Sequence, residues 1–344
     1  MNKSLFDNTE VAFKMKKNFH LYNAIFLFNI ITKKILVGIL TNMTIMMLKF
    51  RLPIKWILKG TIYKHFCGGT DIAECKKIIS DMYKMNVCSI LDYSVEGLSN
   101  ENSFNNSCEK KIKIIDIVSE NDAVPFAVFK PTSIGRYELF KAVSDGKKLL
   151  KDEEVEWSNV VTRFHKICNH ALINKTKILI DAEEYEVQKA IDELALEMMK
   201  SYNKEYVIVY NTIQLYRWDR IDYLKKLFKD YSKSKFSFGF KLVRGAYMEK
   251  ERLLAKNGNY KSPICSSKNE TDLNFNKAID LMFKHIKKAD FFIATHNEFS
   301  NYKVIDLMKK NEIKNNSDKI WFGQLYGMSD NITFNFCLLY TSDA

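Results

Sequence analysis

The sequence predicts an α/β protein built as a (β/α)₈ barrel. Seven short apolar runs, rich in β-branched and aromatic residues and nearly free of charge, recur from about residue 85 onwards. Such runs are typical of strands buried on both faces of a parallel sheet. Longer segments with helical periodicity separate them, and this alternation indicates βα units in series. The length of 344 residues also suits one α/β barrel.

The predicted strands follow in the order 89–94, 126–130, 177–181, 206–210, 238–243, 291–295 and 320–324. Between them, the segment 185–200 repeats apolar residues at helical steps of three and four: Val187, Ile191, Leu194 and Met198. Thr271 and Ser300 lie where the N-caps of two further helices are expected. The first strand is not followed by a Gly-rich phosphate loop, which disfavours a dinucleotide-binding Rossmann domain.

Residues 1–85 are predicted to form a helical arm ahead of the barrel, which we assign to residues 86–336. The most apolar stretch, 18–48, is divided by Lys33 and Lys34 into uncharged runs shorter than the ~20 residues of a membrane span. We expect amphipathic helices here. The alternative, which would have a functional meaning, is a peripheral membrane contact through the Lys-flanked apolar face of these helices.

Composition limits the cellular location and the class of partner. Seven cysteines, an odd number scattered along the chain, suit reduced thiols in a cytoplasmic protein. The first twenty residues contain Asp7 and Glu10 but no Arg, which disfavours a mitochondrial transit peptide. The formal net charge is +12, but it comes from 46 Lys and only 7 Arg, spread along the chain. Because specific nucleic-acid readers usually cluster Arg on one face, no nucleic-acid partner is expected.

Polar residues gather at the carboxyl ends of the predicted strands, where barrel active sites lie. They are Asp92, Lys130, Asp181, Gln214, Arg244 to Tyr247, Thr295 to Asn297, and Gln324 to Tyr326. Lys130 and Asp181 are placed to pair across this mouth. The Gly245-Ala246 step allows a flat or phosphate-bearing ligand to approach the backbone closely.

The chain has no H-E-x-x-H, C-x-x-C or serine nucleophile elbow. His165 and His170 would point to different sides of one helix, so no metal site is predicted. The cationic, polar mouth therefore suits an anionic cofactor together with a small acid, and spacing alone does not define the reaction.

Several ordered motifs resemble the proline dehydrogenase family. KLVRGAYMEKER (241–252) carries the strongest resemblance, and the others are LDYSVEG (91–97), FAVFKPTSIGR (126–136), ILIDAEE (178–184), VYNTIQLYRWDR (209–220), ATHNEFS (294–300) and WFGQLYGMSD (321–330). The resemblance implies a distorted (β/α)₈ barrel with an N-terminal helical arm and non-covalent FAD at the strand ends. It also implies oxidation of L-proline to 1-pyrroline-5-carboxylate by hydride transfer to the flavin, with electrons passed to a membrane quinone.

Where this sequence matches a family motif, the resemblance implies a role for the matching residue. Gln214, Lys241, Val243, Arg244, Gly245, Ala246, Thr295, His296 and Asn297 would contact FAD, and Asp181 and Lys241 would be catalytic. Lys130 would hold the proline carboxylate, while Tyr247 and Leu325 would pack around the ring. Lys241 stands where many members have Arg, so the charge is kept without the bidentate geometry. Alternation along a strand puts Lys241, Val243 and Gly245 on one face.

After Asp330 the chain departs from the family, and residues 337–344 are predicted to be a tail foreign to it. We therefore expect a barrel without its eighth strand and last helix, which binds proline weakly and folds poorly. Two rival functions stay open: a flavin barrel that oxidises another cyclic amino acid, such as hydroxyproline, and a non-catalytic basic binding protein. Bound flavin, visible by its absorption, would separate an enzyme from the latter.

Overall fold

The computed structural model describes residues 5–50, 52–53, 63–69, 72–92 and 100–341. The chain divides into two compact units. Cys88–Gly323 forms the first, which we call the barrel unit. Met1–Val87 and Gln324–Ala344 form the second, which we call the terminal unit. The motif 91–97 lies partly outside the described residues, because only its first two residues, Leu91 and Asp92, are among them.

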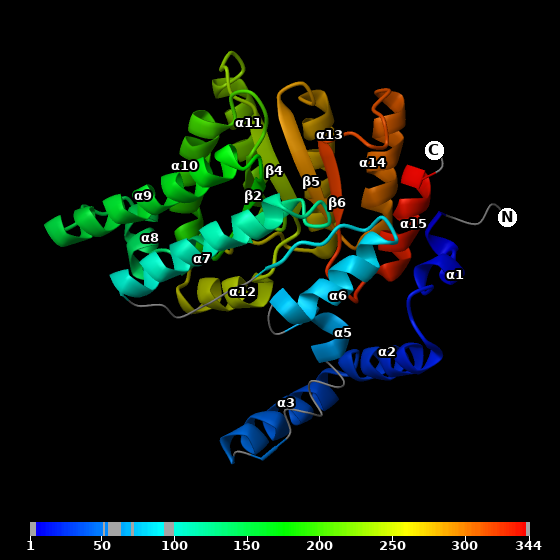
Figure 1. Ribbon diagram of the computed structural model, residues 1–344. Helices are drawn as coiled ribbons and strands as arrows, with labels where there is room; N and C mark the ends of the chain where they lie inside the picture. Colours follow the sequence, from blue (N-terminus) through cyan, green and yellow to red (C-terminus); the bar gives the residue numbers. More distant parts are fainter. Residues whose placement is uncertain (1–4, 51, 54–62, 70–71, 93–99, 342–344) are drawn as a thin grey trace. The chain divides into compact units, whose positions relative to one another are not determined.

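The barrel unit contains a six-stranded parallel sheet in the order β1-β2-β3-β4-β5-β6, so each strand pairs with the next one along the chain (Figure 1). The strands are β1 (Phe126–Phe129), β2 (Lys177–Ile180), β3 (Val209–Gln214), β4 (Phe238–Val243), β5 (Ala289–Ala294) and β6 (Ile320–Gly323). Sequential parallel pairing with helical crossovers is the arrangement of a (β/α) barrel. The predicted fold class is confirmed, in the form of a curved partial barrel.

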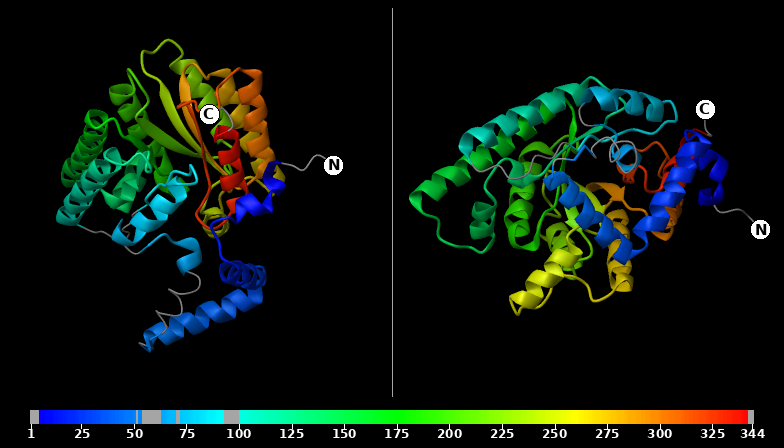
Figure 2. Two further views of the ribbon diagram at one scale, coloured as in Figure 1. Left: turned by 45° about the vertical axis from the view of Figure 1, so that its right-hand side comes forward. Right: turned by 90° about the horizontal axis from the view of Figure 1, so that it is seen from below.

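Helices connect these strands and cover the sheet (Figures 1 and 2). They are α7 (Glu101–Ser119), η3 (Pro131–Ser133), α8 (Tyr137–Ser144), α9 (Lys151–Ile173), α10 (Tyr185–Tyr202), α11 (Arg220–Asp230), α12 (Met248–Asn257), α13 (Lys268–Lys284) and α14 (Glu298–Lys310). The helix predicted over 185–200 is α10, and its four periodic apolar residues are buried as expected.

Alternate residues of each strand face the helices or the barrel interior. Phe238, Phe240 and Leu242 of β4 are fully buried, and Phe228 of α11 packs against both phenylalanines. On the opposite face, Phe126 of β1 meets the rings of Tyr210, Phe292 and Trp321 edge to face, at centroid distances of 5.5, 5.3 and 5.0 Å. This aromatic layer fills the interior below the strand ends, so the functional side chains stand above a packed core.

Two predicted strands differ from the structure. Of the predicted run 89–94 the structure describes residues 89–92, and within these Leu91 forms a single parallel bridge to Ala127 in place of a strand. The run 206–210 is shifted, because β3 starts at Val209 and continues to Gln214. The cause is local. The side-chain oxygen of Asn203 accepts the backbone N–H groups of Ile208 and Val209, at 2.9 and 2.8 Å. Because these two donors bond to a side chain, they are not available for pairing with a neighbouring strand, and β3 starts later than predicted.

Both predicted N-caps are wrong. α13 is capped by Ser267, whose hydroxyl accepts from Glu270 N, and Thr271 lies in its first turn. α14 is capped by Asn297, and Ser300 supplies the N–H that Asn297 accepts. In each case an equally good capping residue, three or four positions earlier, is the one used.

The terminal unit contains η1 (Leu5–Asp7), α1 (Thr9–Ala12), α2 (Asn18–Ile31), α3 (Lys34–Lys49), α5 (Lys64–Phe66), α6 (Ile72–Tyr83) and α15 (Asp330–Thr341). The two ends of the chain pack together: Phe6 meets Phe336 at 5.2 Å between ring centroids, and Lys16 pairs with Asp330. The predicted domain boundaries at 85 and 336 remain predictions.

Helices α2 and α3 meet at a bend of 102° (Figure 2). Of the helices described, no single one is long and apolar enough to cross a membrane. Taken together, the two helices of this bent pair have the length and composition of a broken span. Both carry exposed apolar side chains, led by Phe19, Tyr22 and Ile35, which are 74%, 73% and 83% exposed.

Candidate active site

The carboxyl ends of β1, β2, β3 and β4 each contribute one polar side chain to a common edge. Lys130 follows β1, Asp181 follows β2, Gln214 ends β3, and Lys241 lies near the end of β4. Because the strands are parallel and paired in sequence, their ends meet at one edge of the sheet. The structure thus places Lys130, Asp181 and Gln214, which strand-end positions predicted, at the same edge as Lys241, which the family motif indicated.

Asp181 and Lys241 form the central ion pair of this edge. Lys241 Nζ donates to Asp181 Oδ1 at 2.7 Å, and the two side chains are only 18% and 17% exposed. The hydroxyl of Thr212, the register partner of Lys241, lies 3.5 Å from the same carboxylate oxygen. Partial burial makes each charge depend on the other, since an unpaired charge here would lose hydration without compensation. Asp181 therefore fixes the ammonium group of Lys241. Lys241 is thus a partner of Asp181 that the strand-end analysis did not name, and the predicted pairing of Asp181 with Lys130 stays a prediction.

Lys130 and Tyr247 lie in the same electrostatic neighbourhood. Burial raises the pKa of Tyr247 to about 12, against the opposing charge of Lys130, while the acids Glu183, Glu184 and Asp181 reinforce the rise. The Tyr247 phenol therefore stays protonated at neutral pH and can donate a hydrogen bond. Tyr247 also precedes α12 as its N-cap residue.

The nitrogen of the Gln214 side-chain amide has a hydrogen-bond partner, whereas its oxygen has none. Its Nε2 donates to the backbone carbonyl of Glu183 at 2.9 Å, which fixes the amide orientation. Its Oε1 is buried and has no hydrogen-bond partner. Because a buried acceptor without a partner costs free energy, its oxygen is suited to a ligand that brings an N–H donor. The isoalloxazine ring of FAD carries such a ring N–H, so Gln214 fits the cofactor that the family resemblance implies.

The turn after β4 is shaped by a close contact between Gly245 and the Tyr216 ring. Gly245 has φ of +137°, and a Cβ at this position would lie 2.5 Å from a ring carbon of Tyr216. Backbone bonds hold the turn, with Leu215 N donating to Val243 O at 2.8 Å and Tyr216 N donating to Arg244 O at 2.7 Å. Ala246 is exposed beside it. The glycine is thus required by the protein's own packing, whether or not a ligand also approaches.

Three further residues predicted to contact the cofactor, Arg244, Thr295 and Asn297, also form side-chain hydrogen bonds within the protein. Arg244 donates from Nε to Asp272 at 2.7 Å and from its terminal nitrogens to Thr295 and Ser300. Thr295 Oγ1 also accepts from Asn297 N, and Asn297 Oδ1 caps α14. These contacts brace the ends of β4 and β5 against each other. Their predicted role in binding FAD stays a prediction.

His296 and Leu325 complete the predicted set. The surface of His296 is partly open to solvent, but the protein atoms that surround the rest of the side chain desolvate the imidazole and, together with the nearby charge of Arg244, lower its pKa, so the ring is neutral at neutral pH. Leu325 belongs to the terminal unit and is 67% exposed. Its predicted place beside the substrate ring stays a prediction.

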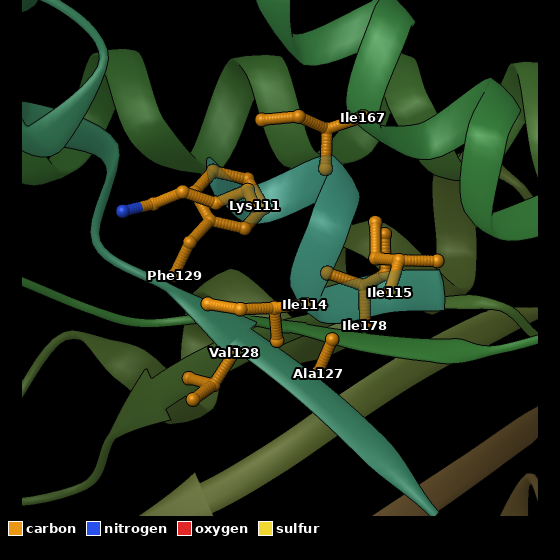
Figure 3. Close-up of a pocket in the computed structure, with 8 residues that line it drawn as sticks. All are labelled: Lys111, Ile114, Ile115, Ala127, Val128, Phe129, Ile167 and Ile178. Carbon is orange, nitrogen blue, oxygen red and sulfur yellow. The ribbon is translucent and has the colours of Figure 1, made fainter. Parts of the chain in front are cut away.

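Two hollows in the barrel unit lie away from these residues. A cavity of about 10 Å³ between α7, α9 and the first two strands is lined by isoleucines and other apolar side chains, and the Lys111 amino group points away from them (Figure 3). It is barely large enough for one water molecule. A groove of about 450 Å³ runs between α11 and α13, bordered by Trp218 and several lysines. None of the predicted site residues lines either hollow.

Sequence reasoning missed Glu183 and Thr132. Glu183 is only 4% exposed, and burial raises its pKa to about 7, although two hydrogen bonds from Thr132 oppose the rise. It stands two residues after Asp181, so the available signal was a second acid close to the end of a predicted strand.

The fold and the strand-end residues together define a (β/α) barrel protein. At its strand ends it carries the ion pair of Asp181 with Lys241 and the unpartnered amide oxygen of Gln214. The sequence model described as "Proline dehydrogenase" matches residues 75–340. This chain therefore belongs to the proline dehydrogenase family, a family of oxidoreductases.

Individual relatives support the family and differ in their names. The carbapenem antibiotics biosynthesis protein CarD of Pectobacterium carotovorum is 31% identical over 270 residues, which covers 78% of this chain and 69% of CarD. Mitochondrial proline dehydrogenase 1 of Dictyostelium discoideum is 28% identical over 82% of this chain and 57% of its own length. Hydroxyproline dehydrogenase of Xenopus laevis is 26% identical, over 81% of this chain and 67% of its own length.

Among solved structures, proline utilization A (PutA) of Bdellovibrio bacteriovorus superimposes with a TM-score of 0.69 at 20% identity. The match covers 82% of this chain but only 30% of PutA. It supports the barrel fold, and the chain spans just over half of the Dictyostelium relative and less than a third of PutA.

Proposed function

We propose that this chain is a flavin-dependent dehydrogenase that oxidises L-proline to 1-pyrroline-5-carboxylate. Family membership supports the reaction class. The observation that carries the proposal is the Asp181–Lys241 pair, 2.7 Å between Nζ and Oδ1, beside the open Oε1 of Gln214. This edge combines fixed positive charge with an unused acceptor, which suits a flavin and a zwitterionic amino acid.

The residues divide the work between cofactor and substrate. FAD, when bound, would supply the two-electron acceptor. Gln214 would accept a hydrogen bond from its ring, Lys241 would present a fixed cation, and the turn formed by Arg244, Gly245 and Ala246 would border it. Because Asp181 holds the Lys241 ammonium in place, that charge needs no rearrangement when electron density on a neighbouring ligand increases.

The substrate side would be handled by Lys130 and Tyr247. The Lys130 ammonium would neutralise the carboxylate of a small amino acid, and the protonated Tyr247 phenol would offer a donor and an aromatic wall. These assignments rest on strand-end placement, charge and the family motifs.

Purified protein should show flavin absorption in the visible range, and anaerobic L-proline should bleach it. The same bleaching should be weaker with trans-4-hydroxy-L-proline. The hydroxyproline dehydrogenase relative makes that substrate the second candidate, so the ratio of kcat/KM for the two amino acids decides between them. Protein that binds no added FAD would contradict the proposal and favour a non-catalytic role.

We further propose that electrons leave through a membrane quinone, and that the protein works at the cytoplasmic face of a membrane through α2 and α3. Residues 11–70 contain ten Lys and Arg and no Asp or Glu. Within that stretch, α2 and α3 expose Phe19, Tyr22 and Ile35. Apolar side chains beside unbalanced positive charge favour the surface of an anionic bilayer.

Vesicle flotation tests this arm. Wild-type protein should float with vesicles rich in phosphatidylglycerol and much less with pure phosphatidylcholine vesicles. Phe19→Glu combined with Ile35→Glu should reduce flotation at least tenfold, because both apolar contacts are lost and two acids are added. Val155→Glu is the matched control, since Val155 is 63% exposed on α9 of the barrel unit. Equal flotation of wild type and the double variant would contradict the proposed contact.

A further inference from the structure

We infer that Glu183 is the positioning residue of the candidate active site, which holds the ends of β1, β2 and β3 in register for the ligand. The inference rests on the proposed function and adds to it a residue with no role assigned so far. Each polar group of Glu183 has a partner, and these partners belong to different segments of the barrel unit.

The Glu183 carboxylate joins the end of β1 to the end of β2. Oε1 accepts the backbone N–H of Thr132 at 2.8 Å, and Oε2 accepts the Thr132 hydroxyl at 2.5 Å. Thr132 stands two residues after Lys130, and Glu183 stands two residues after Asp181. These two bonds therefore limit how far the backbone that carries Lys130 can move relative to the backbone that carries Asp181.

The Glu183 main chain sets the orientation of Gln214. Its carbonyl accepts from Gln214 Nε2 at 2.9 Å, so the amide oxygen of Gln214 must face the other way. That oxygen is the buried acceptor without a partner. If Glu183 shifted, the amide would lose its fixed rotamer, and the acceptor would no longer be held toward the ligand.

A buried polar chain supports Glu183 from behind. Its N–H donates to Gln188 Oε1 at 2.8 Å, and Gln188 Nε2 donates to Asp192 Oδ1 at 2.9 Å. Asp192 also accepts from Asn211 of β3 and from Arg220, at 2.9 and 2.6 Å. Gln188, Asp192 and Asn211 are at most 5% exposed, so this chain is shielded from water and rigid.

Charge supports the same placement. Lys130 lowers the pKa of the Glu183 carboxyl, opposing the dominant effect of burial. Glu183 in turn contributes to the raised pKa of Tyr247. The carboxylate is therefore close enough to the substrate-side residues to influence them, while its oxygens accept their hydrogen bonds from Thr132.

Variants of Glu183 and Thr132 test the inference, with added FAD and L-proline as probes. Glu183→Ala should weaken FAD binding at least tenfold and raise KM for proline about tenfold, because the side-chain bridge to β1 is lost and the backbone carbonyl that orients Gln214 is no longer anchored by it. Glu183→Gln keeps an acceptor for Thr132 N and should stay within about threefold of wild type in both. Thr132→Val should weaken FAD binding by about three- to tenfold. Adding it to Glu183→Ala should cause no further loss, since the two residues act through one contact.

Asn203→Ala is the matched control. Asn203 is fully buried, and its side-chain oxygen accepts two backbone N–H groups at the amino end of β3, at 2.9 and 2.8 Å, so its removal unsettles the fold comparably at the edge of the sheet opposite the candidate site. Unchanged FAD affinity in Glu183→Ala, or an equal loss in Asn203→Ala, would overturn the inference while wild type still binds FAD. Wild type that binds no FAD would overturn the proposed function as well. If Glu183→Ala fails to fold, the contrast between Thr132→Val and Glu183→Gln decides.

Discussion

Lys241→Met is expected to abolish measurable proline oxidation, with a loss in kcat/KM of at least a hundredfold, and Asp181→Leu should have a similar effect. Each variant leaves its partner as an unpaired charge in a site where both side chains are less than a fifth exposed. We expect each single variant to lose about 1–3 kcal/mol of unfolding free energy, because a partly buried charge loses its partner.

The double variant separates structure from chemistry. Lys241→Met with Asp181→Leu removes both charges and leaves two apolar side chains, and replacing a buried ion pair by apolar residues often restores stability. We expect its unfolding free energy to return toward that of wild type while proline oxidation stays lost. Dye-linked oxidation and denaturant unfolding measure the two quantities. A double variant that regains activity would show that the pair serves only the fold.

Gly245→Ala is expected to have the second largest effect, on both stability and FAD affinity. The new methyl group would lie 2.5 Å from the Tyr216 ring, and the φ of +137° is unfavourable for any residue with a Cβ. Backbone strain alone costs about 1–3 kcal/mol, and the overlap must be relieved by moving a ring that is only 3% exposed. Because Arg244 and Ala246 flank this glycine, FAD binding should weaken with the distortion.

Gly146→Ala is the control for backbone strain. Gly146 also has positive φ, +69°, but nothing lies within 4 Å of a Cβ placed there. Denaturant unfolding of both variants should show a clearly larger loss for Gly245→Ala. Equal losses would mean that the Tyr216 contact contributes nothing, and that conformational preference alone explains the glycine.

The strand ends were predictable because two independent patterns coincide there. Short apolar runs locate buried parallel strands, and a polar residue directly after such a run must lie at the edge of the sheet. This reasoning found Lys130, Asp181 and Gln214 before any contact was known. Lys241 came from the family motif, and its bond to Asp181 requires the register of β2, β3 and β4, which one sequence does not contain.

The helix caps, the start of β3 and the burial of Glu183 could not be predicted, because the local sequence allows more than one structure at each of these places. Ser267 and Thr271 are both good capping residues, and the packing of the helix selects between them. Tyr206 has a strand-like sequence context, yet it is 39% exposed and precedes the side-chain bonds of Asn203. Glu183 looks like an ordinary surface acid in a helix-start motif, and its burial appears only once Thr132 is brought against it.

The sequential order of the sheet has a consequence for synthesis on the ribosome. Since every strand pairs with its immediate predecessor, the sheet can be extended one βα unit at a time as the chain emerges. Lys130, Asp181, Gln214 and Lys241 are supplied by the first four of these units. The nascent polypeptide would therefore assemble the charged half of its ligand cradle before β5 and β6 have been translated.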